Sequence, residues 1–182
     1  MCCAGVEDTV TALAWSPFGS ETEDKKFGVI IAGLKSGKIS FWSPDAMLAQ
    51  AKGSSESDLL NLGCLGMKDV DSDPINCLAV NKFKPNLIVS GGSALLLHNF
   101  DKSFENADSF TPTQEPQDAG AITSVAWNYK IAHIFASAAD TGMATVWDVK
   151  NKKSIMTLND NNFGLETFSN EGAAYDFAAK SL

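Results

Sequence analysis

The sequence predicts an all-β protein built from about three similar, four-stranded antiparallel sheets. The first observation is a set of short apolar or alternating runs, each bounded by Gly, Pro, Asn, Asp or Ser. Such runs are typical of strands joined by tight turns. The second observation is that three runs of this kind recur in the same order along the chain. With 182 residues, of which 45% are hydrophobic, the chain suits one domain with an ordinary core.

Each repeat contains three expected strands. They are Thr11–Pro17, Phe27–Gly33 and Lys38–Trp42, then Ile75–Asn81, Asn86–Gly92 and Ala94–Phe100, then Ile122–Asn128, His133–Asp140 and Met143–Val149. The alignment makes two sets of positions equivalent: Trp15, Val80 and Trp127, and Trp42, Asn99 and Trp147. The spacing is close to the roughly 40–50 residues of WD and kelch repeats, in which each repeat forms one propeller blade.

A fourth strand is expected at the outer edge of each blade. The candidates are Leu59–Leu65 in the first repeat, a weak one within 104–110 in the second, and Lys153–Leu158 in the third. The acidic stretch Asp101–Gly120 is otherwise expected to be mostly exposed loop. The stretch Ser43–Ser57 is also interpreted as a connection between strands, where insertions cost little stability.

The dipeptide Trp147–Asp148 is the strongest local motif, because WD at the end of a third strand indicates a propeller blade. We expect the indole to pack between blades and to require a partner for its one donor. Asp140, followed by Thr and Gly, is expected to cap a tight turn. The structural positions of this type are Trp147, Asp148, Asp140, Trp127, Trp15 and Trp42. The usual Gly-His pair is missing, with Asp73 or Asp118 as nearby carboxylates.

The predicted fold is therefore an incomplete WD-repeat β-propeller over residues 1–160. Its blades are expected at about 9–66, 74–110 and 121–160. Residues 161–182 do not continue the repeat and are expected to form a short helix or a poorly ordered tail.

Charge and composition exclude several classes of function. The formal net charge of −8 argues against nucleic acid and against direct docking on an anionic membrane. No signal peptide or membrane-spanning apolar stretch is visible. The cysteines Cys2, Cys3, Cys64 and Cys77 form no CxxC pair, so we expect reduced thiols, a cytoplasmic location and no metal site.

No constellation for catalysis or for a cofactor is present. Gly33–Ser40 resembles a phosphate loop only superficially, because the glycine spacing is wrong and a strand follows in place of a helix. His98 and His133 lie on expected strands and are interpreted as structural. We therefore predict no enzyme, no cofactor and no catalytic residue.

The stretches Thr11–Leu48, Pro74–Ser93 and Ile122–Leu158, taken in order, resemble the N-terminal propeller of the Sec-thirty-one family. The most specific stretch is AWNYKIAHIFASAADTGMATVWDVKNKKSIM (126–156). The resemblance implies a scaffold of the outer cage of the COPII vesicle coat, which acts in transport from the endoplasmic reticulum to the Golgi. It also implies a location on the cytosolic side of exit sites and vesicles, and membrane contact only through the coat.

The resemblance covers only the second to fourth of the seven blades in that family. Contacts with a Sec-thirteen-type partner or the inner-coat complex are implied for the family, but the blade-donating and Pro-rich segments are not matched here. Three blades cannot close a ring, so self-association through open blade edges is expected. The alternative function is a generic WD-repeat adaptor in another cytosolic complex. A small hydrolase or nucleotide-binding enzyme is a distant third.

Overall fold

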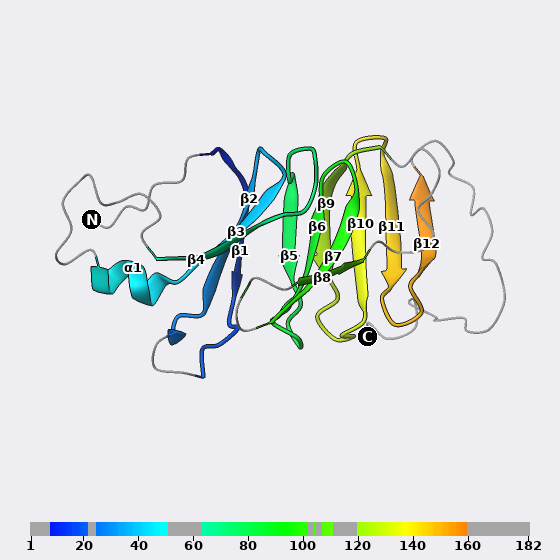
Figure 1. Ribbon diagram of the computed structural model, residues 1–182. Helices are drawn as coiled ribbons and strands as arrows, with labels where there is room; N and C mark the ends of the chain where they lie inside the picture. Colours follow the sequence, from blue (N-terminus) through cyan, green and yellow to red (C-terminus); the bar gives the residue numbers. More distant parts are fainter. Residues whose placement is uncertain are drawn as a thin grey trace.

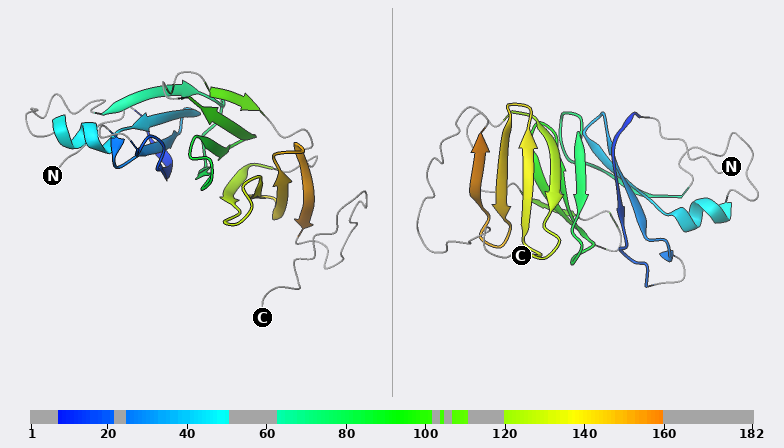
Figure 2. Two further views of the ribbon diagram at one scale, coloured as in Figure 1. Left: turned by 90° about the horizontal axis from the view of Figure 1, so that it is seen from below. Right: turned by 180° about the vertical axis from the view of Figure 1, so that it is seen from behind.

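Three four-stranded antiparallel sheets follow one another along the chain and fan out in a curved row (Figures 1 and 2). This computed structural model describes residues 8–21, 25–50, 63–101, 104, 107–110 and 120–159. Each sheet is formed by four consecutive strands, in the order in which the chain makes them. The predicted fold class, a set of three four-stranded propeller blades, is confirmed.

The strands have the following bounds. The first sheet contains β1 (Val10–Ser16), β2 (Val29–Leu34), β3 (Lys38–Trp42) and β4 (Cys64–Asp69). The second sheet contains β5 (Cys77–Val80), β6 (Leu87–Gly91), β7 (Leu95–Phe100) and β8 (Ala107–Phe110). The third sheet contains β9 (Ile122–Trp127), β10 (Ile134–Ala139), β11 (Met143–Asp148) and β12 (Lys153–Asn159).

Strand register makes the three sheets directly comparable. Trp15 pairs with Ile30 and Ile30 with Trp42 in the first sheet, and Trp127 pairs with Phe135 and Phe135 with Trp147 in the third. In the second sheet the corresponding row is Val80, Ile88 and His98. The sequence alignment made Asn99 equivalent to Trp42 and Trp147, and it was wrong by one residue. Because successive strand residues point to opposite faces, His98 and not Asn99 shares the face of Trp42 and Trp147.

The outer strands were predicted with unequal success. The third sheet ends in β12, as the apolar run Lys153–Leu158 predicted, and the second ends in β8, within the weak candidate. In the first sheet the prediction Leu59–Leu65 was displaced, because β4 begins at Cys64 and continues to Asp69. Lys38 pairs with Asp69 in that strand, and their side chains form an ion pair at 3.5 Å. Because the prediction for β4 followed apolar residues alone, it missed the polar end of this strand.

Helix α1 (Pro44–Gln50) was not predicted, because Ser43–Ser57 was interpreted as a simple connection. Its start follows ordinary capping rules. The Ser43 hydroxyl accepts a hydrogen bond from the Ala46 backbone N at 3.2 Å, and Pro44 occupies the first helical position. A second finding concerns Phe104, which stood at the start of the weak strand candidate in a stretch expected to be mostly exposed loop and lies outside β8. Its ring is buried against Phe41, with centroids 5.1 Å apart.

Two hydrophobic clusters hold the three sheets together. The first joins the first and second sheets through residues such as Ile31, Phe41 and Ile88. The second joins the second and third sheets through residues such as Leu97, Phe135 and Trp147. The core thus lies between neighbouring sheets, as in a propeller. The tail 161–182 and most of the stretch 111–120 lie outside the described residues, so the division at residue 160 stays a prediction.

Candidate interaction site

The contact between neighbouring sheets is built in the same way twice. Ile75 precedes the second sheet, packs over Gly33 of β2 and donates its backbone N–H to the Leu34 carbonyl at 3.2 Å. Ile122 of β9 packs over Gly91 of β6 in the same manner. Its N–H donates to the Gly92 carbonyl at 2.8 Å.

Close approach explains the two glycines at these positions. A Cβ at Gly33 would lie 2.6 Å from an Ile75 methyl carbon, and one at Gly91 would lie 2.3 Å from an Ile122 methyl carbon. No ordinary packing allows such distances. The contact surface between sheets is therefore a repeated, specific device.

Trp127 completes the contact between the second and third sheets. Its indole N–H donates to the Ala79 carbonyl of β5 at 3.1 Å, and its ring lies 5.2 Å from that of Phe135. Only 8% of its surface is exposed. A strand of one sheet thus supplies both the apolar cover and the acceptor for the tryptophan of the next.

Trp15 holds the same register position in the first sheet but has no preceding sheet to contact among the described residues. It is 61% exposed, and its indole N–H donates to the carbonyl of Phe27, in the turn just before β2, at 2.7 Å. Leu13, two residues earlier on the same face, is 66% exposed. The inner part of this face, which we call the open Trp15 face, is an unpaired copy of the surface that Trp127 buries.

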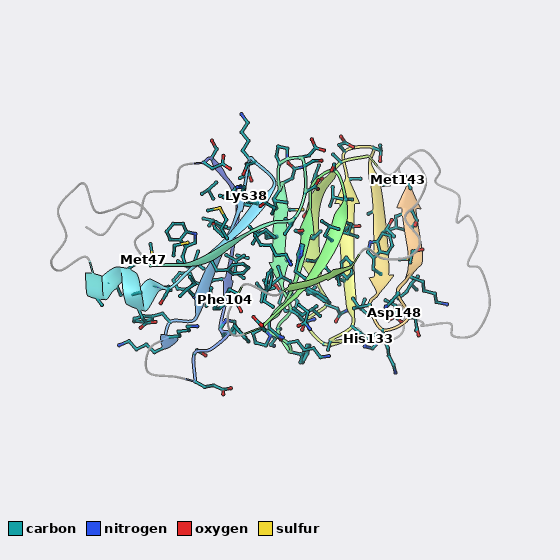
Figure 3. All side chains as sticks on the ribbon, in the orientation of Figure 1. Lys38, Met47, Phe104, His133, Met143 and Asp148 are labelled. Atoms are coloured by element: carbon teal, nitrogen blue, oxygen red, sulfur yellow. The ribbon has the colours of Figure 1, made fainter. Side chains whose placement is uncertain are left out.

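The outer part of the same face is covered. Trp42 is buried in a small cluster with Ala32 and Leu34, and Met47 of α1 packs against that cluster. Figures 1 and 3 show α1, with Met47 labelled, at the end of the row beside the first sheet. The helix therefore occupies part of the position that a neighbouring sheet takes elsewhere in the row.

In every sheet, a buried serine hydroxyl is the hydrogen-bond partner of a ring nitrogen on the third strand. Trp147 donates its indole N–H to the Ser137 hydroxyl at 2.8 Å, and Trp42 donates to the Ser40 hydroxyl at 2.9 Å. In the second sheet, His98 Nε2 lies 2.7 Å from the Ser90 hydroxyl. Each ring nitrogen that is removed from water thus has a partner, as burial requires.

Burial lowers the pKa of His98 to about 4, with the charge of Lys68 as a smaller cause. The imidazole is therefore neutral at physiological pH and behaves as a core residue. His98 was noted from the sequence only as a structural histidine, and its equivalence to the tryptophans was missed. The run ALLLHNF is apolar on both faces of the strand, with Leu95 and Leu97 on one face and Phe100 on the other, so alternation alone did not fix the register of His98.

Carboxylates tie each sheet to the segment that precedes it. Asp140 accepts a hydrogen bond from the Ala121 backbone N at 3.0 Å. In the second sheet the arrangement is inverted, because Asp71 lies in the linker and accepts from the Ser93 hydroxyl at 2.9 Å. Asp8 accepts from the Ser36 backbone N at 3.0 Å, and hydrogen bonding from Ser36 lowers the pKa of that carboxyl.

Each sheet is thus tied to its preceding segment by a carboxylate, but the carboxylates stand at different positions of the repeat. The Asp–Thr–Gly pattern therefore identified only Asp140. Asp73 donates its backbone N–H to Asp71 at 3.2 Å, and Asp118 lies outside the described residues. Asp148, the second half of the WD dipeptide, accepts hydrogen bonds from the backbone N of Lys150 and of Asn151, at 2.8 and 3.1 Å.

The described residues bring together no catalytic constellation. Among them, no group of three or more His, Cys, Asp or Glu side chains could hold a metal ion. Burial raises the pKa of the Cys77 thiol to about 11, which keeps it protonated and unreactive. The apparent phosphate loop runs from β2 through a turn at Gly37 into β3, so no helix N-terminus faces it.

The far side of the row ends in a second open face. Strand alternation places Ala136 and Val146 of the third sheet opposite to Phe135 and Trp147, on the side away from the second sheet. Met156 pairs with Val146 and Leu158 with Ala144, and both of these outer side chains are exposed. The row of sheets thus ends in apolar surface on both sides.

No protein-family model matches the chain. In contrast, the chain is similar to curated relatives and to solved structures. It is 34% identical over 148 residues to "Protein transport protein SEC31" of Dictyostelium discoideum, covering 80% of the chain and 11% of that relative. It is 31% identical over 166 residues to the protein of the same name from Phaeosphaeria nodorum, covering 90% of the chain and 12% of that relative.

The structural comparisons agree. "COPII on membranes, outer coat vertex" matches with a TM-score of 0.63 and 24% identity, over 84% of this chain and 36% of that one. "Crystal structure of RRP9 WD40 repeats" matches with a TM-score of 0.60 and 16% identity, over 87% and 41%. At these identities the structural matches show the fold alone.

The sheets and their contacts therefore define blades of the WD-repeat propeller class. Within that class, the chain is a SEC31-like, partial WD-repeat region. It spans about a ninth of the length of the curated relatives that it matches. Among the described residues, no helix has the length and apolar character needed to cross a membrane.

Proposed function

We propose that this chain acts as a structural scaffold module of the COPII outer coat, in vesicle transport from the endoplasmic reticulum to the Golgi. It acts through protein–protein contacts and not through catalysis. Support comes from the SEC31 relatives, which are named as protein transport proteins, and from the likeness to the outer coat vertex. The module lies on the cytosolic side of the membrane and contacts it only through other coat subunits.

One observation carries the proposal. Trp15 and Trp127 occupy equivalent positions, yet one is exposed and the other is buried on a neighbouring sheet. Exposed large apolar side chains in a contiguous face mark association sites. The open Trp15 face is therefore a blade-contact surface that takes a further blade, supplied by another SEC31-type segment or by a coat subunit with a propeller.

The test is the sedimentation-velocity mass of the full chain, alone and mixed with a SEC31 fragment that contains the remaining blades. We expect a defined complex with the fragment. Leu13→Asp with Trp15→Asp is expected to abolish the complex. The matched control is Phe83→Asp, which changes an aromatic residue that is 49% exposed and lies on the β5–β6 loop, away from this face. A stable monomer that ignores the fragment, or a complex insensitive to the Leu13 and Trp15 changes, contradicts the proposal.

A further inference from the structure

Charge is separated between the two ends of the sheets, although the chain as a whole is acidic. Figure 3 places Lys38 and Met143 at one end of the strands, and His133 and Asp148 at the other. We call the first the turn end, because it holds the β2–β3, β6–β7 and β10–β11 turns. The second, formed by the β5–β6 and β9–β10 loops and the β11–β12 turn, is the lysine end.

The two ends differ in the sign of their described charges. At the turn end, the carboxylates Asp8, Asp69, Asp71, Asp73 and Asp140 outnumber Lys35 and Lys38. At the lysine end of the second and third sheets, the exposed cations are Lys82, Lys84, Lys130, Lys150, Lys152 and Lys153. The described carboxylates there are Asp101, Asp108 of β8 and Asp148, and Asp148 is only 9% exposed and bonded to its own turn.

Three of these lysines, Lys82, Lys84 and Lys130, stand on two loops that are built alike and held by hydrogen bonds. Asn81 accepts hydrogen bonds from the backbone N of Phe83 and Lys84, at 2.9 and 3.0 Å. Asn128 accepts from the backbone N of Lys130 and of the next residue, at 2.8 and 2.9 Å. The Asn81 amide also donates to the Ala132 carbonyl at 2.7 Å, which joins the two loops. Loops held in this way lose little further freedom when they bind.

An open groove of about 230 Å³ lies between these loops. Ala79, Val80 and Lys82 line it from the second sheet, and residues 125–129 line it from the third. Trp127 supplies an aromatic wall, and Tyr129 stands exposed beside it. The floor of the groove includes apolar side chains and has room for one side chain such as Phe or Leu. Lys82 lines the groove, and Lys84 and Lys130 follow lining residues on the same two loops.

We propose that this groove binds a short acidic peptide segment of another protein, with one aromatic or large aliphatic side chain inserted between the loops. The lysines supply the charge complementarity, and the floor supplies the anchor. This surface lies apart from the open Trp15 face, so its test is independent of the proposed function.

Charge distribution favours a peptide over a nucleic acid or a membrane. The chain contains no arginine, the residue best suited to bidentate phosphate contacts. A long polyanion would also meet the repulsion of the net charge of −8, whereas a short segment samples only the field within a Debye length of about 8 Å. A concave groove fits one inserted side chain better than it fits a flat lipid surface.

The probe is a fluorescein-labelled peptide with a central Phe flanked on each side by four Asp or Glu residues, and anisotropy is measured with the full chain, starting at physiological ionic strength. We expect binding that weakens as salt rises. Lys82→Glu with Lys130→Glu is expected to weaken it about tenfold or more, because two attractive charges become repulsive. Lys35→Glu with Lys38→Glu changes the net charge equally at the turn end and is expected to have less than about a twofold effect.

A second pair of measurements tests the anchor. Replacing the central Phe of the peptide by Ala is expected to weaken binding to the unchanged chain. Tyr129→Ala is expected to reduce that difference, and as an exposed position it leaves folding intact. The proposal is overturned if the peptide does not bind, or if both charge-reversed variants bind equally well. It is also overturned if single-stranded RNA or phosphatidylserine vesicles bind more tightly than the peptide.

Discussion

The first and third sheets carry tryptophan at the same two register positions, in two different environments. In the third sheet, Trp127, Phe135 and Trp147 are all buried, because the second sheet covers them. In the first sheet, Trp42 is buried under Met47 of α1, whereas Trp15 is exposed. The comparison shows that the neighbouring sheet, and not the strand itself, decides whether the innermost tryptophan belongs to a core.

The second sheet shows how far the side chains at these paired positions can vary. Val80, Ile88 and His98 replace the aromatic residues, yet they pack against the first sheet with the same register. The contact tolerates different side chains provided that volume is filled and each buried polar atom is bonded.

The largest expected effect comes from removing the buried member of the tryptophan pair. Trp127→Ala is expected to lower the free energy of unfolding by about 3–5 kcal/mol, since it leaves a cavity between two sheets. Trp15→Ala is the matched control, with an expected loss below about 1 kcal/mol, because that ring is mostly exposed. Urea denaturation followed by circular dichroism measures both. Equal losses of stability in the two variants would contradict the difference in burial between Trp127 and Trp15.

The buried histidine is expected to make stability depend on pH. Its pKa is about 4 in the folded chain and about 6.5 when unfolded, so the unfolded state binds a proton first as the pH falls. Stability from this group is complete above about pH 6.5 and decreases by about 3 kcal/mol as the pH falls to 4.

The control is His98→Gln, which cannot take up a proton in this range. The urea midpoint of each protein is measured between pH 7 and pH 4, and the difference between the two curves isolates this residue from the carboxylates. Parallel curves would show that His98 is not held neutral by burial.

A smaller effect is expected from the hydroxyl partners of the buried rings. Ser137→Ala leaves the Trp147 indole N–H without its acceptor and is expected to cost about 1–3 kcal/mol. Ser124→Ala, on an exposed position of β9, is expected to change stability by less than about 0.5 kcal/mol. Thermal unfolding compares the two. A silent Ser137→Ala would mean that the hydroxyl does not support the tryptophan.

The smallest expected effect concerns the linking carboxylates. Asp140→Ala removes the acceptor for the Ala121 N–H at an exposed turn and is expected to cost about 1 kcal/mol. Asp71→Ala is expected to cost a similar amount, since it makes the equivalent link in the second sheet. Unfolding midpoints that differ strongly between the two variants would contradict the equivalence of the two links.

Strand positions were predictable where apolar runs were long and bounded by turn residues. The second and third strands of each sheet fall within their predicted runs, apart from Leu34 at the end of β2, because both faces of these strands are packed. β4 was displaced because its burial is partial and its far end is charged, so the apolar run did not mark it. Helix α1 was missed because a seven-residue helix has too little periodicity, although Ser43 and Pro44 carried a capping signal.

The candidate interaction site was only partly predictable. The tryptophans were found because aromatic residues recur in register, but the sequence could not show that Trp15 and Trp127 differ in burial. That difference depends on which sheet lies beside each strand, and this is a property of the assembled row. The groove at the lysine end was missed because a net charge of −8 describes the whole chain and conceals a local cationic surface.

The most direct test of the central claim is the solvent accessibility of the four tryptophans. The full chain, labelled with 5-fluorotryptophan and kept dilute, is examined by ¹⁹F NMR with a neutral paramagnetic agent, and resonances are assigned by single Trp→Phe variants. We expect the Trp15 resonance to broaden strongly while those of Trp42, Trp127 and Trp147 are protected. We further expect Trp15 to become protected when a fragment with the remaining blades is added. An accessible Trp127, or a Trp15 that is protected in the dilute chain alone, would contradict the assignment of the open Trp15 face.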